Sequence, residues 1–571
     1  MDKYSLNTDI FSLNETNKSD KLPPLLRKLL SIRGITEKDD IESFLNPDYR
    51  SLHDPYLLAD MEKAVKRILQ AIEKKEKIVI YSDYDADGIP GAVILHDFFK
   101  GAGHENFTNY IPDRHLEGFG FHLKAIENFS KDEVKLIITI DCGIADVEQV
   151  RMAQEKGIDV IITDHHEPKA ELPPAFAVIN PKHPASKYPF TMICGAATAF
   201  KLVQGVLASG QKVFPWKEGQ EKWLLDMAGL ATLSDMVPLL GENRILAYFG
   251  LKVLRKSRRP GLKRLFRKVG VNQSSASEDD IGFMITPRIN AASRMGNPRD
   301  AFHLLSTNDE AIALEKTDIL NKINDERKGV VAGMAKEVRA KIKEDTERFE
   351  KVIVIGNPKW RPSLLGLVAG SLVEDFCKPV FLWGRDGEEI IKGSCRGDGK
   401  INTLAIMERI SGEFLQFGGH KAAGGFSVSF EKIHTLPEAI LKSYESICAE
   451  EASSGRERAK TMIDEKLSLS DLTWKTFDLI DKLAPFGMSN PKPIFLIEDT
   501  QVEYVKIFGK QKNHLELGLR GTRVKGICFF VSKDKLELLI PETKVNLVAS
   551  LEKSTFGGRK ELRLRIIDVF K

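Results

Sequence analysis

The chain has 571 residues, of which 42% are hydrophobic and 29% are charged, and its formal net charge is +3. This length provides three or four domains with ample cores, and the nearly neutral balance means that any nucleic-acid-binding surface must be local. No apolar run approaches the ~18 residues of a membrane span, and the segment after Met1 lacks the apolar region of a signal peptide. Six cysteines without a Cys-x-x-Cys pair argue against zinc and a disulfide framework. We therefore expect a cytoplasmic protein without a membrane anchor.

After a helical entry segment over residues 1–60, an Asp-rich turn follows the first buried strand. Residues 77–81 predict the strand and 89–99 a helix, with Asp83, Asp85 and Asp87 between them. Three carboxylates this close repel one another unless a cation or protons lie among them, and oxygen-rich sites suit Mg²⁺, Mn²⁺ or Ca²⁺. A calcium EF-hand loop is excluded, because its twelfth position requires Glu and here is Ile94. The alternative is a helix cap or a solvated turn.

Two further polar clusters end apolar runs downstream. Asp141 follows a strand over 135–140, and Asp164, His165 and His166 follow another over 159–163, with a helix near 145–156 between the two. Strand, helix and strand at this spacing form a βαβ unit, so the strands should be parallel and their polar ends should share one edge of the sheet. Carboxylates with imidazoles favour Mn²⁺ or Mg²⁺ over Ca²⁺ or Zn²⁺. The alternative is a polar loop with surface histidines.

A fourth candidate is Asp235, a lone acid in the mostly apolar stretch 230–238. An acid in such surroundings needs a partner.

These segments, in this order, resemble the four motifs of the DHH phosphoesterase superfamily. The motifs are Asp83–Gly88, Asp141–Gly143, Asp164–His166 and Ser234–Leu239. Within the superfamily the chain is similar to single-strand-specific exonucleases over nearly its whole length, at segments 29–34, 53–61, 110–114, 287–294, 418–424 and 485–491. The resemblance implies an α/β metal core over residues 61–242 and a smaller α/β domain, named DHHA1, over 346–452.

The resemblance also implies a site for two ions, Mn²⁺ or Mg²⁺. Asp141 would bridge both ions and Asp85 would bind one of them, while the ligands of the other would be Asp87, His165 and Asp235. Two cations ~3.5–4 Å apart activate water and stabilise the leaving oxygen of a phosphodiester.

Three further residues have expected roles around this site. His166 would contact the phosphate or move a proton, Asp83 would assist the first ion or orient its neighbours, and Asp164 would support a ligand.

The chain departs from the family pattern at several positions. Tyr81 stands where members of the superfamily often carry a metal-binding His, so the first ion is expected to have fewer protein ligands. Arg361 and Ser371 stand where a His and an Arg are usual, and Ser82 and Ser293 stand where Gly is usual.

A helical connector is expected over 243–345, ending in one long helix over 309–344, before the second α/β domain. By resemblance, Arg114, Ser394 and Arg396 would bind a terminal 5′ phosphate; the alternative for such arginines is simple solvation. On the same grounds Arg288 and Asn290 would lie near the cleft, or else make polar contacts between helices. The remaining candidates for the cleft are Gly418, Gly419 and His420, for which a tight turn is the favoured alternative.

Residues 453–571 predict a barrel of the OB type, with short strands over 501–507, 514–519, 524–531, 544–551 and 562–569. Such barrels bind single strands through a basic groove and stacking rings. Residues 501–571 hold fifteen Lys and Arg against eight Asp and Glu, and 241–270 hold ten against one. The second run is equally compatible with a solvated helix face. The rings available are Tyr504, Phe508, Phe529, Phe530 and Phe556, of which Phe508 and Phe556 are expected to be most exposed.

The sequence therefore predicts a metal-dependent exonuclease that degrades single-stranded DNA from 5′ to 3′ into 5′-mononucleotides in repair and recombination. The polarity, a monomeric state and cooperation with single-strand-binding protein and a helicase follow from the resemblance alone. One alternative is a DHH enzyme acting on cyclic dinucleotides, short oligonucleotides or pyrophosphate. Another is a non-catalytic adaptor that binds single strands.

Overall fold

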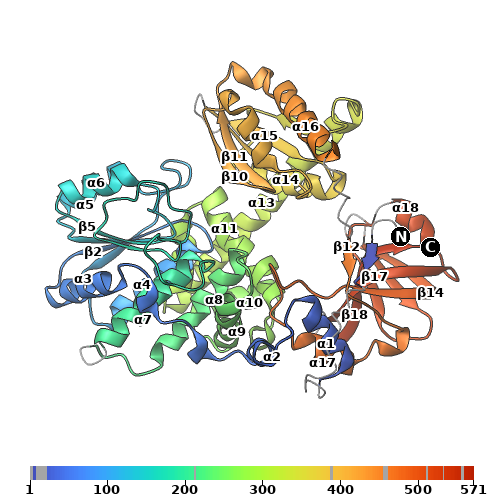
Figure 1. The fold of residues 1–571 in the computed structure, drawn as a ribbon, viewed down its shortest axis with the longest axis horizontal. Helices are drawn as coiled ribbons and strands as arrows, with labels where there is room; N and C mark the ends of the chain where they lie inside the picture. The colour runs from blue at the N-terminus through green and yellow to red at the C-terminus, as the bar shows by residue number, and fades with distance from the viewer. Residues whose placement is uncertain are drawn as a thin grey trace.

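The computed structural model describes residues 4–7, 22–210, 214–385, 390–453, 461–509, 512, 514–531, 533–554 and 559–571. It places an α/β layer structure, a second α/β domain and a C-terminal barrel around a helical centre (Figure 1). This confirms the predicted fold class. Among the described helices, none is both long enough and apolar enough to cross a membrane.

The first α/β unit is built on a parallel five-stranded sheet in the order β3-β2-β4-β5-β6. Its central strands are buried on both faces and consist of apolar, mostly β-branched residues, the pattern of a sheet covered by helices on both sides. The strands are β2 (Ile78–Ser82), β3 (Phe107–Tyr110), β4 (Leu136–Ile140), β5 (Asp159–Thr163) and β6 (Ala177–Ile179).

Helices cover both faces of this sheet, as Figure 1 shows. One face packs against α3 (Met61–Glu73), α4 (Gly88–Gly101), α7 (Gly195–Gly210) and α8 (Leu225–Ser234), and the other against α5 (Leu123–Lys131) and α6 (Val147–Glu155). Helix α6 stops where the sequence predicts, because Gly157 adopts a φ of 72° that favours glycine after a helix.

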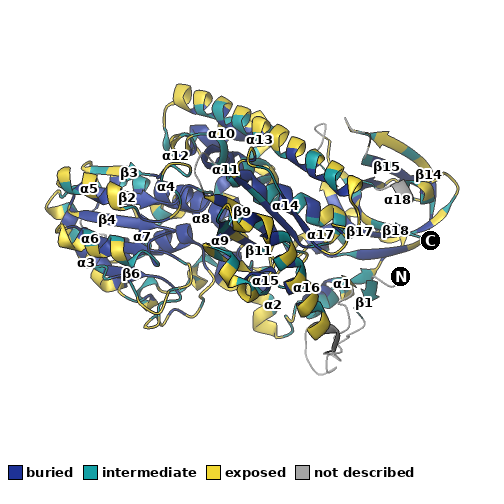
Figure 2. Cartoon of the chain, turned by 90° about the horizontal axis from the view of Figure 1, so that it is seen from above, coloured by how far each residue is buried: buried dark blue, intermediate teal, exposed yellow. Residues whose placement is uncertain are grey.

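A helical region continues from this core into the second domain. Its helices are α9 (Gly241–Leu254), α10 (Pro260–Val269), α11 (Thr286–Met295), α12 (Pro298–Ser306) and the 35-residue α13 (Glu310–Glu344). Helix α13 runs along one edge of the molecule in Figure 2, and its alternating buried and exposed turns match the predicted long connector.

The basic run over 241–270 lies mostly on the surface, where Lys252, Lys256, Arg258, Lys263, Arg267 and Lys268 are exposed. Arg259 forms ion pairs with Asp97 at 2.6 Å and Asp226 at 2.8 Å, and Arg264 pairs with Glu310 at 2.9 Å. The exposed residues of the run agree with a solvated helix face, whereas Arg259 is occupied by acids that are distant along the chain.

The second α/β domain has a mixed sheet in the order β10-β11-β9-β8-β7, in which only β7 and β8 are parallel. Its strands are β7 (Ile353–Gly356), β8 (Val380–Arg385), β9 (Ile391–Arg396), β10 (Gln416–His420) and β11 (Ala423–Val428). Its helices are α14 (Pro362–Phe376), α15 (Thr403–Arg409) and α16 (Leu436–Ser453).

The C-terminal barrel closes because β14 pairs with both β15 and β17, while β16 pairs with β18 in parallel. The elements are β12 (Thr461–Ile463), β13 (Glu465–Lys466), α17 (Trp474–Asp481), β14 (Phe495–Phe508), β15 (His514–Leu519), β16 (Lys525–Cys528), α18 (Lys533–Leu538), β17 (Lys544–Ser554) and β18 (Glu561–Phe570). Phe530 is 77% exposed and Phe508 is half-buried, so the prediction that Phe508 is among the most exposed rings is wrong. Phe556 and the predicted turn at Gly557 and Gly558 lie outside the described residues.

The two ends of the chain meet at this barrel (Figure 1). Strand β1 (Tyr4–Leu6) pairs with β12 in parallel. Helices α1 (Pro24–Ile32) and α2 (Lys38–Leu45) contribute Leu26, Leu29, Leu30 and Phe44 to the barrel's own apolar core.

Arg244 joins the helical region to α2 and to the segment that follows α17. Its guanidinium is buried and donates to the carbonyl oxygens of Phe44, Leu483 and Ala484, each at 2.9 Å. Burial lowers the pKa of Arg244 to about 10. It is still charged at neutral pH, and its charge is balanced by the carbonyl dipoles, by the face of the Phe44 ring at 3.7 Å and by the charge of Glu278.

We predict that Arg244→Met destabilises the protein by roughly 3–5 kcal/mol, because three buried carbonyl groups would lose their donor. The midpoint of thermal unfolding should fall by roughly 5–10 °C. Arg258→Met, at an exposed position in the same segment, is the matched control and should leave the midpoint unchanged. Equal midpoints for the two variants would contradict the proposed role of Arg244.

Candidate active site

Three acids lie side by side where neighbouring parallel strands end. Asp83, Asp141 and Asp164 directly follow β2, β4 and β5, and they continue the strand register by one residue. The amide of Asp83 donates to Ile140 O at 3.1 Å, and that of Asp141 to Thr163 O at 2.9 Å. The predicted convergence at one sheet edge is confirmed.

Asp141 lies at the centre of the cluster in a left-handed conformation, with a φ of 61°. Helix α7 begins directly against it, and a β-carbon at Gly195 would lie 2.6 Å from that of Asp141, so only glycine allows this approach. The first amides of α7, at Gly195 and Ala196, donate to the two carboxylate oxygens of Asp87 at 2.6 and 2.8 Å. A helix N-terminus thus holds Asp87 in place.

The Asp-rich turn is fixed by its own backbone and by α11. One carboxylate oxygen of Asp85 accepts from the amides of Asp87 at 2.8 Å and Gly88 at 3.2 Å. Asn290 on α11 accepts from the amide of Ala86 at 2.9 Å. Asn290 therefore lies beside the cluster, as predicted, and orients the turn.

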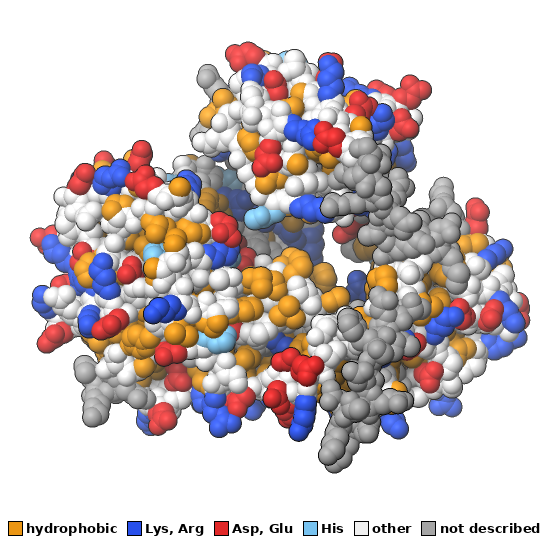
Figure 3. All heavy atoms as spheres, in the orientation of Figure 1, with side chains coloured by type: hydrophobic (Ala, Val, Ile, Leu, Met, Phe, Trp, Pro, Cys, Tyr) orange, Lys and Arg blue, Asp and Glu red, His pale blue; other side chains and the backbone are white. Residues whose placement is uncertain are grey.

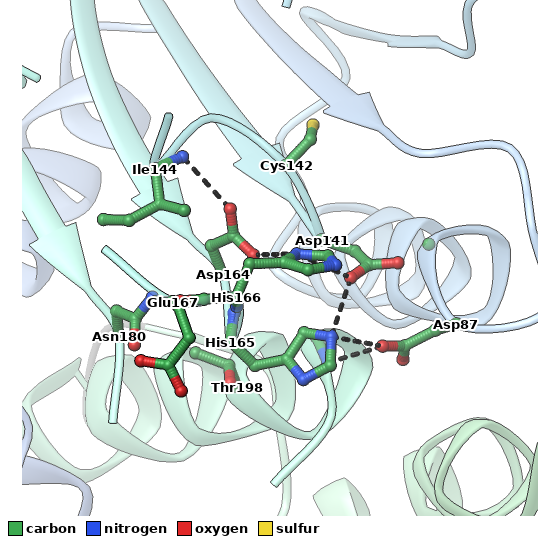
Figure 4. Close-up of polar contacts among 12 residues, drawn as sticks. Asp87, Asp141, Cys142, Ile144, Asp164, His165, His166, Glu167, Asn180 and Thr198 are labelled. Carbon is green, nitrogen blue, oxygen red and sulfur yellow. Dashed lines mark hydrogen bonds and ion pairs between the residues drawn. The ribbon is translucent and has the colours of Figure 1, made fainter. Parts of the chain in front are cut away.

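Both histidines of the Asp164–His166 segment face the acids, as Figure 4 shows. The Nε2 atom of His165 lies 3.1 Å from Asp141, 3.7 Å from Asp87 and 3.8 Å from Asp235. His166 Nδ1 contacts Asp164 at 2.8 Å. Asp235 is the C-cap residue of α8, and this position brings the lone acid to the cluster. His165 is the partner that an acid in an apolar stretch requires.

Burial of like charges dominates the electrostatics. Desolvation and the neighbouring acids raise the pKa values of Asp83 and Asp141 well above their usual range, and raise that of Asp235 to about 8. Burial lowers the pKa of His165.

Asp164 and His166 form an ion pair that opposes this trend. Burial would lower the pKa of His166, but the hydrogen bond with Asp164 outweighs it and raises the value to about 9. Burial would raise the pKa of Asp164, and the hydrogen bonds from His166 hold it below the usual range instead. His166 is therefore a cation at neutral pH beside the acids.

The donor set fits two divalent cations. Three overlapping groups bring their ligand atoms within 4.8 Å of one another: Asp83, Asp85 and Asp141; Asp87, His165 and Asp235; and Asp141, His165 and His166. Asp141 joins the first group to the third, which shares His165 with the second. Carboxylate oxygens of Asp83 and Asp141 are buried without a hydrogen-bond donor, which is the state expected of groups that bind a cation.

Tyr81 supplies no ligand to this cluster. Its ring is fully buried on the other face of the sheet, stacked at 5.2 Å on Tyr110, and its hydroxyl donates to Gly120 O at 2.9 Å. Arg361 contacts the sulfur of Met295 at 3.7 Å, and Ser371 accepts from Arg339 at 3.2 Å.

A cleft of about 550 Å³ lies between this site and the second α/β domain. Figure 3 shows a hollow between the upper domain and the body below it. The core side contributes Tyr84, Arg114 and Phe119, and the domain side contributes α14 and the sheet.

The register of the second sheet defines which residues share a face with Gly418 and Gly425, which line the cleft. Ser394, Gly425 and Gly418 form one cross-strand row, and Arg396, Ala423 and His420 form the next. Arg396 donates to Ser394 Oγ at 3.1 Å. Four of the residues predicted for the cleft therefore lie on one face of the sheet.

Gly418 and Gly419 lie within β10, so the turn favoured for this pair is wrong; the turn follows at Lys421 and Ala422. A β-carbon at Gly419 would lie 2.3 Å from Ala423 O, so glycine is required by close contact between strands.

Arg288 is 6% exposed and donates to Asn321 Oδ1 at 3.0 and 3.1 Å and to Met284 O at 2.6 Å. Its guanidinium makes the contacts between helices that were the alternative to substrate binding.

Arg294, which the predicted set did not include, lies beside the cleft residue Ser363. It donates to Ser363 O at 2.8 Å, and Ser363 Oγ donates back to Arg294 O at 2.9 Å, which ties α11 to α14. Burial and the nearby charge of Arg114 lower the pKa of Arg294 to about 10, while Asp85 opposes this. Its place in the segment 287–294 was the available signal.

Comparisons with known proteins give the class. The model of the DHH family N-terminal domain matches residues 77–233, that of the DHHA1 domain 349–446 and that of the RecJ OB domain 463–568. The protein is thus a member of the DHH class, with a DHH core, a DHHA1 domain and an OB domain.

The relatives define the family. The single-stranded-DNA-specific exonuclease RecJ of Bacillus subtilis is 34% identical over 96% of this chain and 68% of its own length, and that of Haemophilus influenzae is 30% identical over 95% of both. The crystal structure of Thermus thermophilus RecJ with Mn²⁺ matches with a TM-score of 0.78 and 26% identity, over 96% of this chain and 76% of that one. The chain belongs to the RecJ family of single-stranded-DNA-specific exonucleases.

We predict that Mn²⁺ raises the midpoint of thermal unfolding of the metal-free protein by roughly 5–10 °C when present at about 100 times its dissociation constant. Asp141→Asn should abolish this rise, because it removes the carboxylate shared by two of the ligand groups. The substitution should also raise the midpoint of the metal-free protein, since one buried like charge is lost.

Asparagine tolerates the left-handed backbone at position 141, so misfolding does not confuse the result. Asp132→Asn, at an exposed position in the same unit, is the control and should retain the full effect of Mn²⁺. An unchanged rise in Asp141→Asn would contradict the assigned site.

Proposed function

We propose that this protein hydrolyses single-stranded DNA from its 5′ end with two Mn²⁺ or Mg²⁺ ions and releases 5′-mononucleotides during repair and recombination. The observation that carries the proposal is that two chemistries lie on either side of the cleft. Buried acids and histidines gather at the sheet edge of the core, and Ser394 and Arg396 share a face of the second domain's sheet with Gly418 and Gly425, which line the cleft. Membership of the RecJ family supports the substrate class.

The ligands proposed for the ions are Asp85, Asp87, Asp141, His165 and Asp235, with Asp83 completing the first group. When bound, the two ions activate water and neutralise charge that develops on the phosphate.

Side chains of the protein contact the phosphate, transfer the proton and hold the Asp-rich turn in place. His166 contacts the scissile phosphate and donates a proton toward the leaving oxygen, and Asp164 holds its imidazole. Asn290 keeps the Asp-rich turn in place.

Arg114, Ser394 and Arg396 bind the terminal 5′ phosphate, because a guanidinium and a hydroxyl match its oxygens. With the end held there, the phosphodiester that reaches the acids is the first one, so each cycle removes one nucleotide. Gly418 borders the same space, and Gly419 and His420 follow it on β10.

The parts of the chain divide this task along the predicted boundaries. Residues 61–242 carry the chemistry, 346–452 hold the strand end and 453–571 bind the following strand through basic charge and rings such as Phe530. A narrow entry between the two α/β domains excludes duplex.

In the cell we propose a monomer in the cytoplasm, supplied with strands by a helicase and single-strand-binding protein. Six free cysteines support a reducing compartment.

The test is a single-turnover digestion of end-labelled single-stranded and blunt duplex DNA with Mn²⁺, Mg²⁺ or EDTA. Wild type should release mononucleotides from the 5′ end of single strands only, and only with a metal ion. Asp141→Asn should reduce the rate by at least about 10³-fold while retaining strand binding.

Hydrolysis of dinucleotides in preference to long strands would instead favour the small-substrate enzyme. Strand binding without hydrolysis in wild type would favour the adaptor.

We predict that Arg396→Ala lowers kcat/KM on 5′-phosphorylated strands by about 10–100-fold, because a charge-assisted hydrogen bond to phosphate is lost. Strands with a 5′ hydroxyl should be affected much less. Arg409→Ala, on the outside of the same domain, where Arg409 pairs with Glu450, is the control. Equal losses on both types of end would count against a phosphate pocket.

A further inference from the structure

The chain turns sharply where β4 ends. Asp141 has a φ of 61° and Gly143 has a φ of 109°, so the turn contains two residues with a left-handed backbone. Aspartate tolerates this region better than most residues, but the conformation still costs free energy relative to an extended strand. Contacts in the surrounding structure must therefore hold the turn.

The turn decides where the Asp141 carboxylate lies. Side chains alternate between the two faces along a strand, so an extended Asp141 would point to the same face as Thr139. That face is covered by α5 and α6, and its apolar core contains Ile137 and Cys142. With the turn, Asp141 lies against the start of α7 instead, where a β-carbon on Gly195 would be 2.6 Å from that of Asp141. The left-handed backbone thus keeps the carboxylate among the metal ligands and out of an apolar core.

The hydroxyl of Thr139 holds this turn from below. Its Oγ1 donates to the carbonyl oxygen of Cys142 at 2.9 Å. Thr139 is 0% and Cys142 1% exposed, so water has little access to this hydrogen bond. A β-carbon on Gly143 would lie 2.8 Å from Thr139 Oγ1, so glycine lets the chain close over the hydroxyl. In Figure 4 the thiol of Cys142 points away from the histidines, whereas Asp141 faces them.

Backbone contacts support the two ends of the same turn. The amide of Asp141 donates to Thr163 O at 2.9 Å, and the amide of Ile144 donates to Asp164 Oδ2 at 3.1 Å. Thr139 supports the middle of the turn, between these two points. Because its contact comes from a side chain, a substitution can remove the contact and leave the backbone groups unchanged.

We propose that Thr139 is a positioning residue for the two metal ions, because its hydroxyl holds the turn that directs Asp141 toward them. This inference rests on the ligand set of the proposed function and adds a residue that touches neither an ion nor the substrate. Asp141 belongs to two of the three ligand groups, so its displacement would weaken the binding of both ions. Groups that orient a metal ligand typically change metal affinity by about 10–100-fold when they are removed.

The test is an equilibrium titration with Mn²⁺ in the absence of DNA, in which the free ion is measured by its electron paramagnetic resonance signal. Thr139→Val replaces the hydroxyl with a methyl group and should lower the affinity for Mn²⁺ by about 10–100-fold. Thr139→Ser keeps the donor and should bind Mn²⁺ as wild type does. In single-turnover cleavage, Thr139→Val should need more Mn²⁺ by the same factor for half of its maximal rate, and excess Mn²⁺ should restore most of that rate.

Thr163→Val is the matched control. Thr163 is equally buried on the neighbouring strand, and its hydroxyl donates to Thr139 O at 2.7 Å, within the sheet and not across the turn. This variant should lower the midpoint of thermal unfolding of the metal-free protein, as Thr139→Val does, but should retain the affinity for Mn²⁺. If Thr139→Val does not fold, Thr139→Cys is the second variant, because a thiol is only a weak donor, and it should lose affinity in the same direction.

Wild-type affinity for Mn²⁺ in the variant that folds, equal losses in Thr139→Val and Thr163→Val, or failure of Thr139→Ser to retain the affinity would each overturn the inference and leave the exonuclease intact. Wild-type protein that binds Mn²⁺ but does not hydrolyse single strands would overturn the proposed function and leave the role of Thr139 in metal binding.

Discussion

Mutual repulsion of buried carboxylates is the constraint around which this molecule is arranged. Asp83, Asp87, Asp141 and Asp164 are nearly inaccessible to water at one edge of a single sheet. Such charges persist only with protons, with donors or with cations among them. The protein supplies donors to Asp87 and Asp164 and leaves oxygens of Asp83 and Asp141 without any. The fold therefore leaves a place beside Asp83 and Asp141 where the balancing positive charge must come from a bound cation or proton.

The second domain meets this cluster at a fixed separation. The reciprocal hydrogen bonds between Arg294 and Ser363 tie α11 to α14 beside the cleft, and α13 packs on both of these helices. The relative position of the acidic cluster and the second domain is thus set by these three helices, of which α11 also carries Asn290 and α14 lines the cleft with Ser363.

Local pattern predicted the parts of the site that depend on one unit of sheet. The acids after β2, β4 and β5 follow from apolar runs that end in polar residues, because parallel strands bring their ends together. Asp235 and Asn290 are different, since they come from helices whose packing decides where they lie. Sequence favoured a turn at Gly418 and Gly419 because glycine pairs usually mark turns, whereas here they allow close contact between strands. The sequence also could not show that the guanidinium of Arg288 hydrogen-bonds to Asn321, or that Phe530 is more exposed than Phe508.

The meeting of the two ends of the chain sets an order of events during synthesis. Helices α1 and α2 leave the ribosome long before β14–β18, which supply the apolar surface that covers them. At the usual ~5–20 residues per second, their leucines wait on the order of tens of seconds for a partner. During that interval the apolar faces of the N-terminal helices can bind chaperones or another copy of the chain. A polypeptide truncated before β14 would leave these faces exposed permanently.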